Sequence, residues 1–312
     1  AFLEQGAPYF VSVLAYAIGN QTIAQRLFAV REDLIKPSFI TATIGYGSIV
    51  IGLGMIGVLA LLAGIEPMDG DLNNLIPQMA STYLPPFMIG MFFIMVLGSL
   101  SSTADSDLAA LSAIVMTDIY GKNIAKGKPK ASTMLWVGRM TMIVATVVGV
   151  VFASLKLDIL TMLIFVGALW GTIVFPVIAS LYWPRVNNFA FTGAVLAGFA
   201  MFLVVRFGWL PMEGAVGIFF ELLSSVGGGV VIGLMAFGFL GRTAGLIAGT
   251  LAMAAMLPLS LNFLRDYPVL LSSLTAYGVS TLVCVGLSLR NQKRFNFDRI
   301  AERVVAFQRS PH

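Results

Sequence analysis

Long stretches without a single charged side chain recur along the whole chain and constrain its fold more than any other feature. Eight of them contain twenty residues or more, namely 5–25, 38–65, 72–104, 159–184, 186–205, 222–241, 243–264 and 267–289. A helix that crosses the hydrocarbon core of a membrane needs roughly 20 mostly apolar residues. One such stretch is also compatible with a buried helix of a soluble protein, but eight in series are not. Only 11% of the residues are charged, against about 25% in soluble domains.

Hydropathy divides the chain into nine predicted membrane helices. Their approximate ranges are 8–24, 38–64, 87–119, 131–154, 159–183, 190–208, 215–240, 242–262 and 268–289. Most prolines lie at or just outside the ends of these ranges, where a missing amide proton costs least, whereas Pro176 lies inside one of them. The sequence therefore predicts an all-α, polytopic membrane protein.

The basic residues predict how these helices are oriented. Of the 19 Lys and Arg residues, 15 fall in one set of alternate loops and in the tail, three fall in the opposite set, and the last is Arg139. Loops rich in Lys and Arg stay on the cytoplasmic side of a membrane. We therefore expect a multi-pass protein of the cell membrane whose first residues are outside and whose tail, 290–312, is cytoplasmic.

The net charge and the scarcity of Cys and His exclude several function classes. The net charge is +4, but the basic residues sit at helix ends rather than on one face, which argues against a nucleic-acid partner. The only cysteine is Cys284 and the only histidine is the last residue, His312. Disulfide frameworks, Cys- or His-ligated metal sites and histidine acid–base catalysis are therefore not expected, and we predict that the protein is not an enzyme.

Two segments outside the spans carry further predictions. The acidic loop 65–86 falls outside, and its stretch 71–82 can form a short surface helix. The tail mixes aromatic residues with Lys and Arg, which fits either an amphipathic helix on an anionic inner leaflet or a solvated segment. Since the chain has neither an initiator Met nor a signal-peptide pattern, we expect it to be part of a larger protein.

Small residues recur at helix-packing spacing near the C-terminal end of the chain. Gly229 with Gly233, and Gly245 with Gly249, are four residues apart. Small residues at this spacing let membrane helices approach closely. They predict packing and by themselves no function.

The third predicted helix contains a stripe of hydroxyl groups. Ser99, Ser102, Thr103 and Ser106 recur at helical spacing, and Asp105 lies beside them. A carboxylate at the bilayer centre costs at least about 2.5–3.5 kcal/mol, so this face must meet protein or water. Hydroxyl and carbonyl oxygens are the ligands that replace the hydration shell of a small hard cation. The alternative is that these hydroxyls bond their own helix or join it to a neighbour.

Three motifs resemble the sodium:solute symporter family, whose members carry proline, sugars, pantothenate, sialic acid, acetate and urea. The first runs from Ser101-Ser102-Thr103-Ala104-Asp105-Ser106 through Ser112 to Asp118-Ile119-Tyr120. The second is Gly19-Asn20-Gln21 followed by Gln25-Arg26-Leu27-Phe28-Ala29. The third is Leu181-Tyr182-Trp183-Pro184-Arg185, followed by Asn187, Gly193 and Gly198. The motifs stand in the family's order and span about residues 15 to 200.

The resemblance implies a LeuT-like fold made of two inverted repeats of five helices. Residues 1–183 are then core helices six to ten, which form the second repeat, and 184–289 are four peripheral helices. The resemblance further implies that Ser102 and Thr103 offer side-chain oxygens to sodium and that Ser99 offers its carbonyl. Asp105 is then a nearby carboxylate that tunes the field or bonds a neighbouring helix. The first helix of the missing N-terminal half supplies the other sodium ligands through unwound backbone.

The same resemblance implies a substrate site at the midplane of the membrane. The candidate substrate residues are Asn20, Gln21, Thr22, Phe165 and Trp170. A helix cap accounts equally well for the polar triplet, and packing for the two aromatic residues. Apart from Arg139, the core spans hold no Lys or Arg, which favours a neutral or zwitterionic solute such as urea or an amino acid.

The sequence thus predicts sodium-coupled symport of a small organic solute, with membrane lipids and the N-terminal half of the same protein as partners. The alternatives are a cation-coupled carrier from another family with a LeuT-like fold, or a channel. A membrane enzyme and a sensor are further alternatives that the residues support less, because no acid–base or metal set and no signalling module is present in the sequence.

Overall fold

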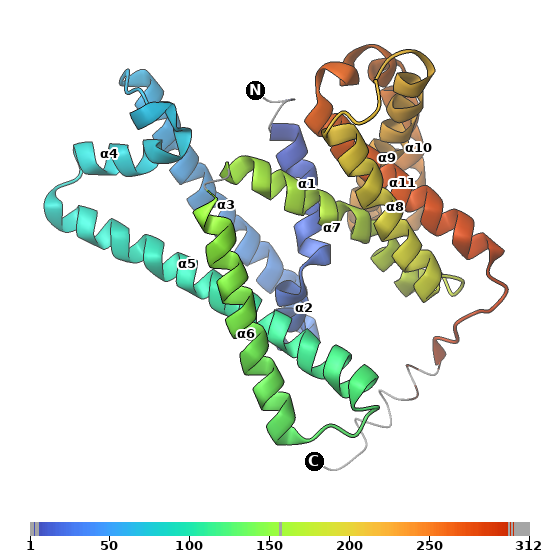
Figure 1. Cartoon of the computed structure of the whole chain (residues 1–312). Coiled ribbons are helices and arrows are strands. Elements are labelled where there is room, and N and C mark those ends of the chain that lie inside the picture. Colours follow the sequence, from blue (N-terminus) through green and yellow to red (C-terminus); the bar gives the residue numbers. More distant parts are fainter. Residues whose placement is uncertain (1–2, 4–5, 156–157, 299, 301, 303–312) are drawn as a thin grey trace. The chain divides into compact units, whose positions relative to one another are not determined.

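The computed structural model describes residues 3, 6–155, 158–298, 300 and 302, and in these ranges the chain is helical without any strand. Figure 1 shows the helices along the chain. They are α1 (Ala7–Gly19), α2 (Gln21–Phe28), α3 (Glu32–Leu62), α4 (Leu75–Tyr83), α5 (Pro86–Ile114), α6 (Ala131–Ser154), α7 (Ile159–Tyr182), α8 (Asn188–Arg206), α9 (Gly214–Leu240), α10 (Arg242–Phe263) and α11 (Pro268–Arg290). Single 3₁₀ turns occupy Met68–Gly70, Leu72–Asn74 and Leu264–Asp266, and α5 continues with π-type hydrogen bonds through Val115–Ile124.

Eight of the nine predicted spans are helices long and apolar enough to cross a membrane, so the prediction of an all-α polytopic protein is confirmed. The first predicted span, 8–24, is wrong as a single helix, since α1 ends at Gly19 and Asn20 adopts an extended conformation with φ −87° and ψ 120°. Gly and Asn are weak helix formers, which explains where the helix breaks.

The structure divides into two compact units, which are described separately. One consists of α1 with α7–α11, and the other is Gln21–Ile159, with α2–α6. This grouping cuts across the predicted division by repeat at residue 183, because α1 and α7 pack with the peripheral helices. The division by repeat stays a prediction.

In the unit of α2–α6, α5 and α6 pack closely at Gly138, which has no side chain to keep them apart. A Cβ on Gly138 of α6 would lie 2.8 Å from the Ser112 hydroxyl oxygen and 2.6 Å from the Met116 sulfur of the α5 segment. The loop between α3 and α5 holds the predicted surface helix, which is confirmed as Leu72–Asn74 followed by α4.

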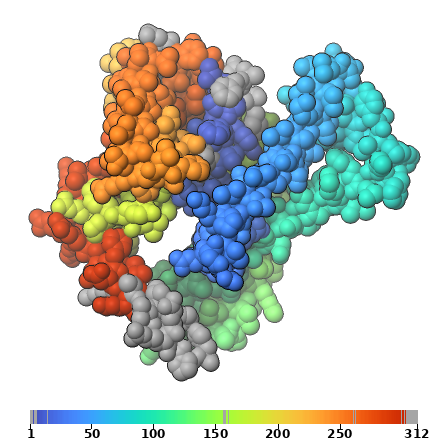
Figure 2. Space-filling model, turned by 180° about the vertical axis from the view of Figure 1, so that it is seen from behind, coloured from blue at the N-terminus to red at the C-terminus, as the bar shows by residue number. Residues whose placement is uncertain are grey.

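In the unit of α1 and α7–α11, α11 is the central helix. Of its most apolar 18-residue window, 72% of the residues are buried, against 6% for α10. Figure 2 shows α10, in orange, on the surface. Backbone meets backbone between α9 and α11, because a Cβ on Gly227 would overlap the Leu274 carbonyl, and one on Gly278 would overlap that of Leu223. Glycine therefore sets the distance between these two helices.

A proline inside α7 is compensated by a hydroxyl of α11. Pro176 has no amide proton to donate to the carbonyl of Thr172, four residues before it. The Ser280 hydroxyl of α11 donates to this carbonyl at 2.5 Å. In a membrane every backbone acceptor needs a partner inside the protein, so this bond allows a proline in the middle of a span.

An ion pair with a buried carboxylate links α9 to the turn that follows α10 in the same unit. The guanidinium of Arg265, which follows α10, donates to both carboxylate oxygens of Glu221 on α9, at 2.7 and 3.0 Å. The Glu221 side chain is 0% exposed and that of Arg265 is 35% exposed. Its hydrogen bond to Glu221 raises the pKa of Arg265. Two-pronged pairing satisfies a carboxylate that burial would otherwise make costly.

The start of the tail lies against the loop that follows α7. The Phe295 amide donates to the Pro184 carbonyl at 2.7 Å, and the Asn291 side-chain amide donates to the Arg185 carbonyl at 2.8 Å. Residues 291–296 are not helical. The predicted amphipathic helix of the tail falls mainly on positions outside those that the structure describes.

Candidate functional site

The predicted sodium residues lie on one face of α5. Ser99, Ser102 and Thr103 are exposed in this chain, and Ser106 is half-buried one turn further on. At 100° per residue, the centre of this stripe points about 130° away from Ser112, which packs against α6. The stripe is therefore free of α6 and open to a partner on its own side.

The hydroxyls of the stripe also bond their own helix. Thr103 Oγ1 donates to the carbonyl of Ser99 at 3.1 Å, and Ser106 Oγ donates to that of Ser102 at 2.9 Å. This is the local bonding that the alternative interpretation predicts. Donation uses only the proton, however, and a hydroxyl oxygen keeps two lone pairs while the accepting carbonyl keeps one. The oxygens of Ser99 and Thr103 therefore remain able to bind a cation.

Asp105 and the hydroxyl of Ser102 have no hydrogen-bonding or ionic partner within the described ranges of the chain. Asp105 is exposed beside the stripe. Its carboxylate is placed next to the oxygens that are predicted to bind sodium, as the sequence predicted for a residue that acts through its charge.

The structure adds one residue that the sequence did not single out for the site. Arg26 of α2 donates through Nη2 to Ser106 Oγ at 3.1 Å, and Ser106 in turn bonds the carbonyl of Ser102. The short α2 thereby lies against the polar face of α5. The pairing joins the second and the first family motif, but a contact between positions 80 apart is not visible in either motif alone.

Of the candidate substrate residues, Trp170 has the most informative position. The rings of Trp170 on α7 and Tyr16 on α1 meet with centroids 4.5 Å apart, at 64°. A Cβ on Gly19 would lie 2.9 Å from Trp170 Cδ1 and 3.3 Å from its Cβ. The indole therefore covers the last turn of α1, directly before the extended residue Asn20.

The other candidates lie elsewhere. Phe165 packs in an aromatic cluster with Phe199 and Phe202 of α8, each with its centroid 5.7 Å away, and so faces a different side of α7 from Trp170. Gln21 is exposed and Thr22 is buried at the start of α2. They belong to the other unit, and Trp170 lies against Gly19, the residue before Asn20.

The chain matches the sequence profile of the sodium:solute symporter family over residues 3–199. The osmoregulated proline transporter OpuE of Bacillus subtilis is 26% identical over 241 residues, which cover 72% of this chain and 47% of that protein. The sodium/pantothenate symporters of Haemophilus influenzae and Escherichia coli are 22% and 26% identical over 206 and 203 residues, which cover 64% and 63% of this chain and 41% of each relative. No solved structure matches the chain.

The chain spans less than half the length of the curated relatives it matches. The relatives are named as transporters and not as enzymes, as the sequence predicted. The alternative of a carrier from another family is overturned, because the matched profile covers more than half of the chain. Eight membrane-spanning helices and this match together identify the chain as a member of the sodium:solute symporter family, in which sodium is the coupling ion.

Proposed function

We propose that this chain forms part of a secondary active transporter in which α5 binds the coupling sodium ion. Ser102 and Thr103 contribute hydroxyl oxygens and Ser99 contributes its carbonyl. The observation that carries the proposal is the exposed hydroxyl face of α5, whose oxygens retain lone pairs although their protons are used within the helix.

Three oxygens on one helix are an incomplete site. Hard cations are held by several oxygen ligands, and in transporters of this architecture unwound backbone carbonyls provide some of them. We therefore propose that an N-terminal half of the same protein packs on the exposed face of α5 and completes the site. Asp105 acts there through its charge, and Arg26 fixes α2 against the stripe through Ser106.

The solute is proposed to bind where α1 ends, against Trp170 and the extended residue Asn20. A small organic solute without strong net charge fits best, such as urea or an amino acid, because the core spans supply no Lys or Arg apart from Arg139. Proline, named for one relative, is a zwitterion, and pantothenate, named for two others, carries one carboxylate. A di-acid as the best solute would contradict this part of the proposal.

The protein is proposed to lie in the cell membrane, with the start of α1 outside and the tail in the cytoplasm. The 15-to-3 distribution of Lys and Arg between the two sets of loops supports this orientation. A single cysteine placed at Asp69, in a Cys284→Ala background, should react with a membrane-impermeant maleimide added to intact cells. One placed at Lys128 should react only after the membrane has been permeabilised. Equal labelling of both positions would contradict the orientation.

The function is tested by uptake of labelled proline, pantothenate, urea and acetate into cells that express the full-length transporter, in sodium and in choline medium. One solute should require sodium, and Thr103→Ala should weaken that requirement. Thr146→Ala is the matched control, since Thr146 of α6 makes the same bond to its own helix, at 2.8 Å to the Met142 carbonyl. Uptake that does not depend on sodium would favour a channel. Equal effects of the two variants would indicate that the hydroxyl stripe serves helix packing and does not bind sodium.

A further inference from the structure

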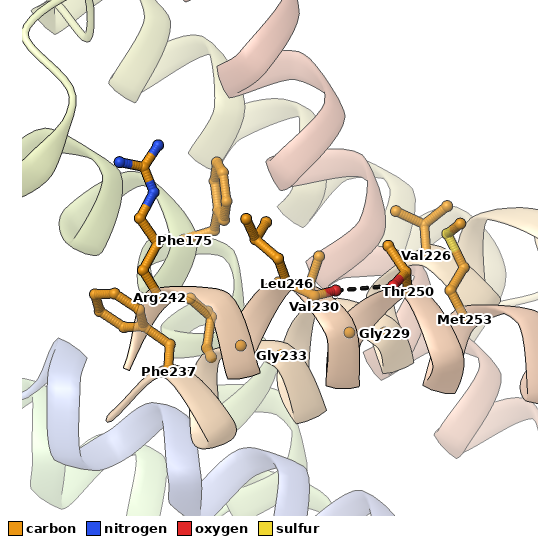
Figure 3. Close-up of a pocket in the computed structure, with 13 residues that line it drawn as sticks. Phe175, Val226, Gly229, Val230, Gly233, Phe237, Arg242, Leu246, Thr250 and Met253 are labelled. Atoms are coloured by element: carbon orange, nitrogen blue, oxygen red, sulfur yellow. Dashed lines mark hydrogen bonds between the residues drawn. The ribbon is translucent and has the colours of Figure 1, made fainter. Parts of the chain in front are cut away.

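A groove with a volume of about 300 Å³ runs along the outer side of α9 and α10 and is bordered by Phe175 of α7. Figure 3 shows Arg242 and Phe237 at one end and Val226 and Met253 at the other. The lining residues of α10 begin with Arg242 and recur every three or four positions as far as Met253. They therefore form one continuous helix face.

Glycine explains why this face is hollow. A Cβ on Gly229 of α9 would lie 2.8 Å from the carbonyl oxygen of Gly249 on α10, and one on Gly233 would lie 3.0 Å from that of Gly245. The two helices therefore meet through their backbones, and no side chain rises from the floor of the groove. The walls are formed by larger apolar side chains, such as Val230 and Leu246.

The interior of the groove offers a polar ligand no free hydrogen-bond donor. The hydroxyl of Thr250 donates to the Leu246 carbonyl of its own helix, at 2.9 Å. Among the described residues that line the groove, Arg242 alone is charged. It is exposed, and within the part of the chain that the structure describes no carboxylate pairs with it.

The length of the groove matches one leaflet. Eleven residues separate Arg242 from Met253, which is about 16 Å of helix, and half of the hydrocarbon core is about 15 Å. The groove therefore complements one anionic phospholipid. Arg242 is an unpaired cation at the depth of the headgroups, and the apolar channel ends near the midplane. The cation fits the phosphate of the lipid and the channel fits one acyl chain.

We propose that the groove between α9 and α10 binds an anionic phospholipid of the cytoplasmic leaflet, with its phosphate on Arg242 and one acyl chain over the glycine floor. This site is separate from the sodium residues on α5. It rests on the proposed orientation and not on sodium coupling, so its test does not use uptake.

The test uses the full-length transporter in phosphatidylcholine vesicles that contain a few per cent of phosphatidylglycerol with a photoactivatable group in one acyl chain. After illumination, mass spectrometry locates the labelled peptides. Labels are expected to concentrate on 226–237 and 242–253. The same photoactivatable chain on phosphatidylcholine should label these segments about fivefold less, which is the effect of one basic residue on an anionic lipid.

Two variants and one control separate this site from general lipid contact. Arg242→Ala should lower labelling by phosphatidylglycerol about fivefold, and Thr250→Phe, which fills the groove without disturbing the glycine contacts, should also lower it. Arg290→Ala removes another exposed arginine at a helix end and should leave the labelling unchanged. The proposal would be overturned if labelling is equal for both lipids, or if Arg242→Ala does not change it. It would also be overturned if the labels spread evenly over all lipid-facing helices, or if labelling is absent because other helices of the protein cover the groove.

Discussion

The contact between Gly19 and Trp170 allows a sharp test of how α1 ends. In Gly19→Ala, the new methyl group would lie 2.9 Å from Cδ1, 3.2 Å from Cγ and 3.3 Å from Cβ of Trp170. Because Cβ and Cγ are close to the backbone of α7, rotation of the indole cannot relieve the overlap. Overpacking of this kind costs about 1–3 kcal/mol, and alanine recovers at most about 1 kcal/mol through its higher helix propensity.

We therefore expect Gly19→Ala to destabilise the transporter by about 1–2 kcal/mol, which lowers the midpoint of thermal unfolding by roughly 1–3 °C, since the shift becomes smaller as the chain becomes longer. The assay is thermal unfolding of the purified full-length protein in detergent. Gly149→Ala is the matched control, because a Cβ there would meet nothing within 4 Å, and it should be neutral or slightly stabilising.

A double-mutant cycle identifies the contact as the cause. In a Trp170→Leu background the indole is absent, so adding Gly19→Ala should cost at least about 0.5 kcal/mol less than it does in the natural protein. If Gly19→Ala leaves the unfolding midpoint unchanged, or if its cost is the same with and without the indole, then Trp170 does not cover the end of α1 and its place in the proposed solute site is wrong.

Three further predictions concern hydrogen bonds that the structure places inside the helical units. Ser280→Ala leaves a backbone carbonyl of α7 without a donor and should cost about 1–3 kcal/mol of unfolding free energy. Thr281→Val, beside it on α11, removes a hydroxyl that has no hydrogen-bonding partner among the described residues and should cost less. Equal costs would contradict the assignment. Glu221→Gln keeps the shape but not the charge of the buried carboxylate, and should lower stability by about 1.5–3 kcal/mol; an unchanged unfolding midpoint would show that the ion pair is not formed. Arg26→Ala should raise the sodium concentration needed for half-maximal uptake while Arg26→Lys recovers part of the loss, and an effect on the solute concentration alone would contradict a role at the sodium stripe.

The membrane helices could be predicted from the sequence because their signal is local. Charge-free stretches of twenty residues that recur along one chain favour membrane spans whatever each helix packs against, and α3 and α5–α11 occupy their predicted ranges to within a few residues at most ends. Gly19 and Asn20 were part of a recognised motif, but hydropathy continues across them and gave one helix where the structure has two. The break depends on the preferred backbone conformation of two residues. A hydropathy average over twenty positions does not detect such a local preference.

The bonds that join distant helices could not be predicted from the sequence. Pro176 signals a carbonyl without a donor, but only tertiary packing brings Ser280, more than 100 positions away, to that carbonyl. Glu221 lies inside a predicted span, and nothing in the sequence indicates that Arg265 pairs with its carboxylate. The hydroxyl stripe on α5 was visible because it lies on one helix, whereas the contact of Arg26 with that stripe was not.

The sodium dependence of uptake tests the central claim most directly. With the solute held constant, uptake by the full-length transporter is measured against sodium concentration for the natural protein, Thr103→Ala and Thr146→Ala. Loss of an oxygen that bonds a charged group costs about 1.5 kcal/mol or more, so Thr103→Ala should raise the half-maximal sodium concentration at least about tenfold, while Thr146→Ala should leave it unchanged. An unchanged sodium dependence in Thr103→Ala would contradict the account, since the hydroxyl face of α5 would then serve helix packing and not ion coupling.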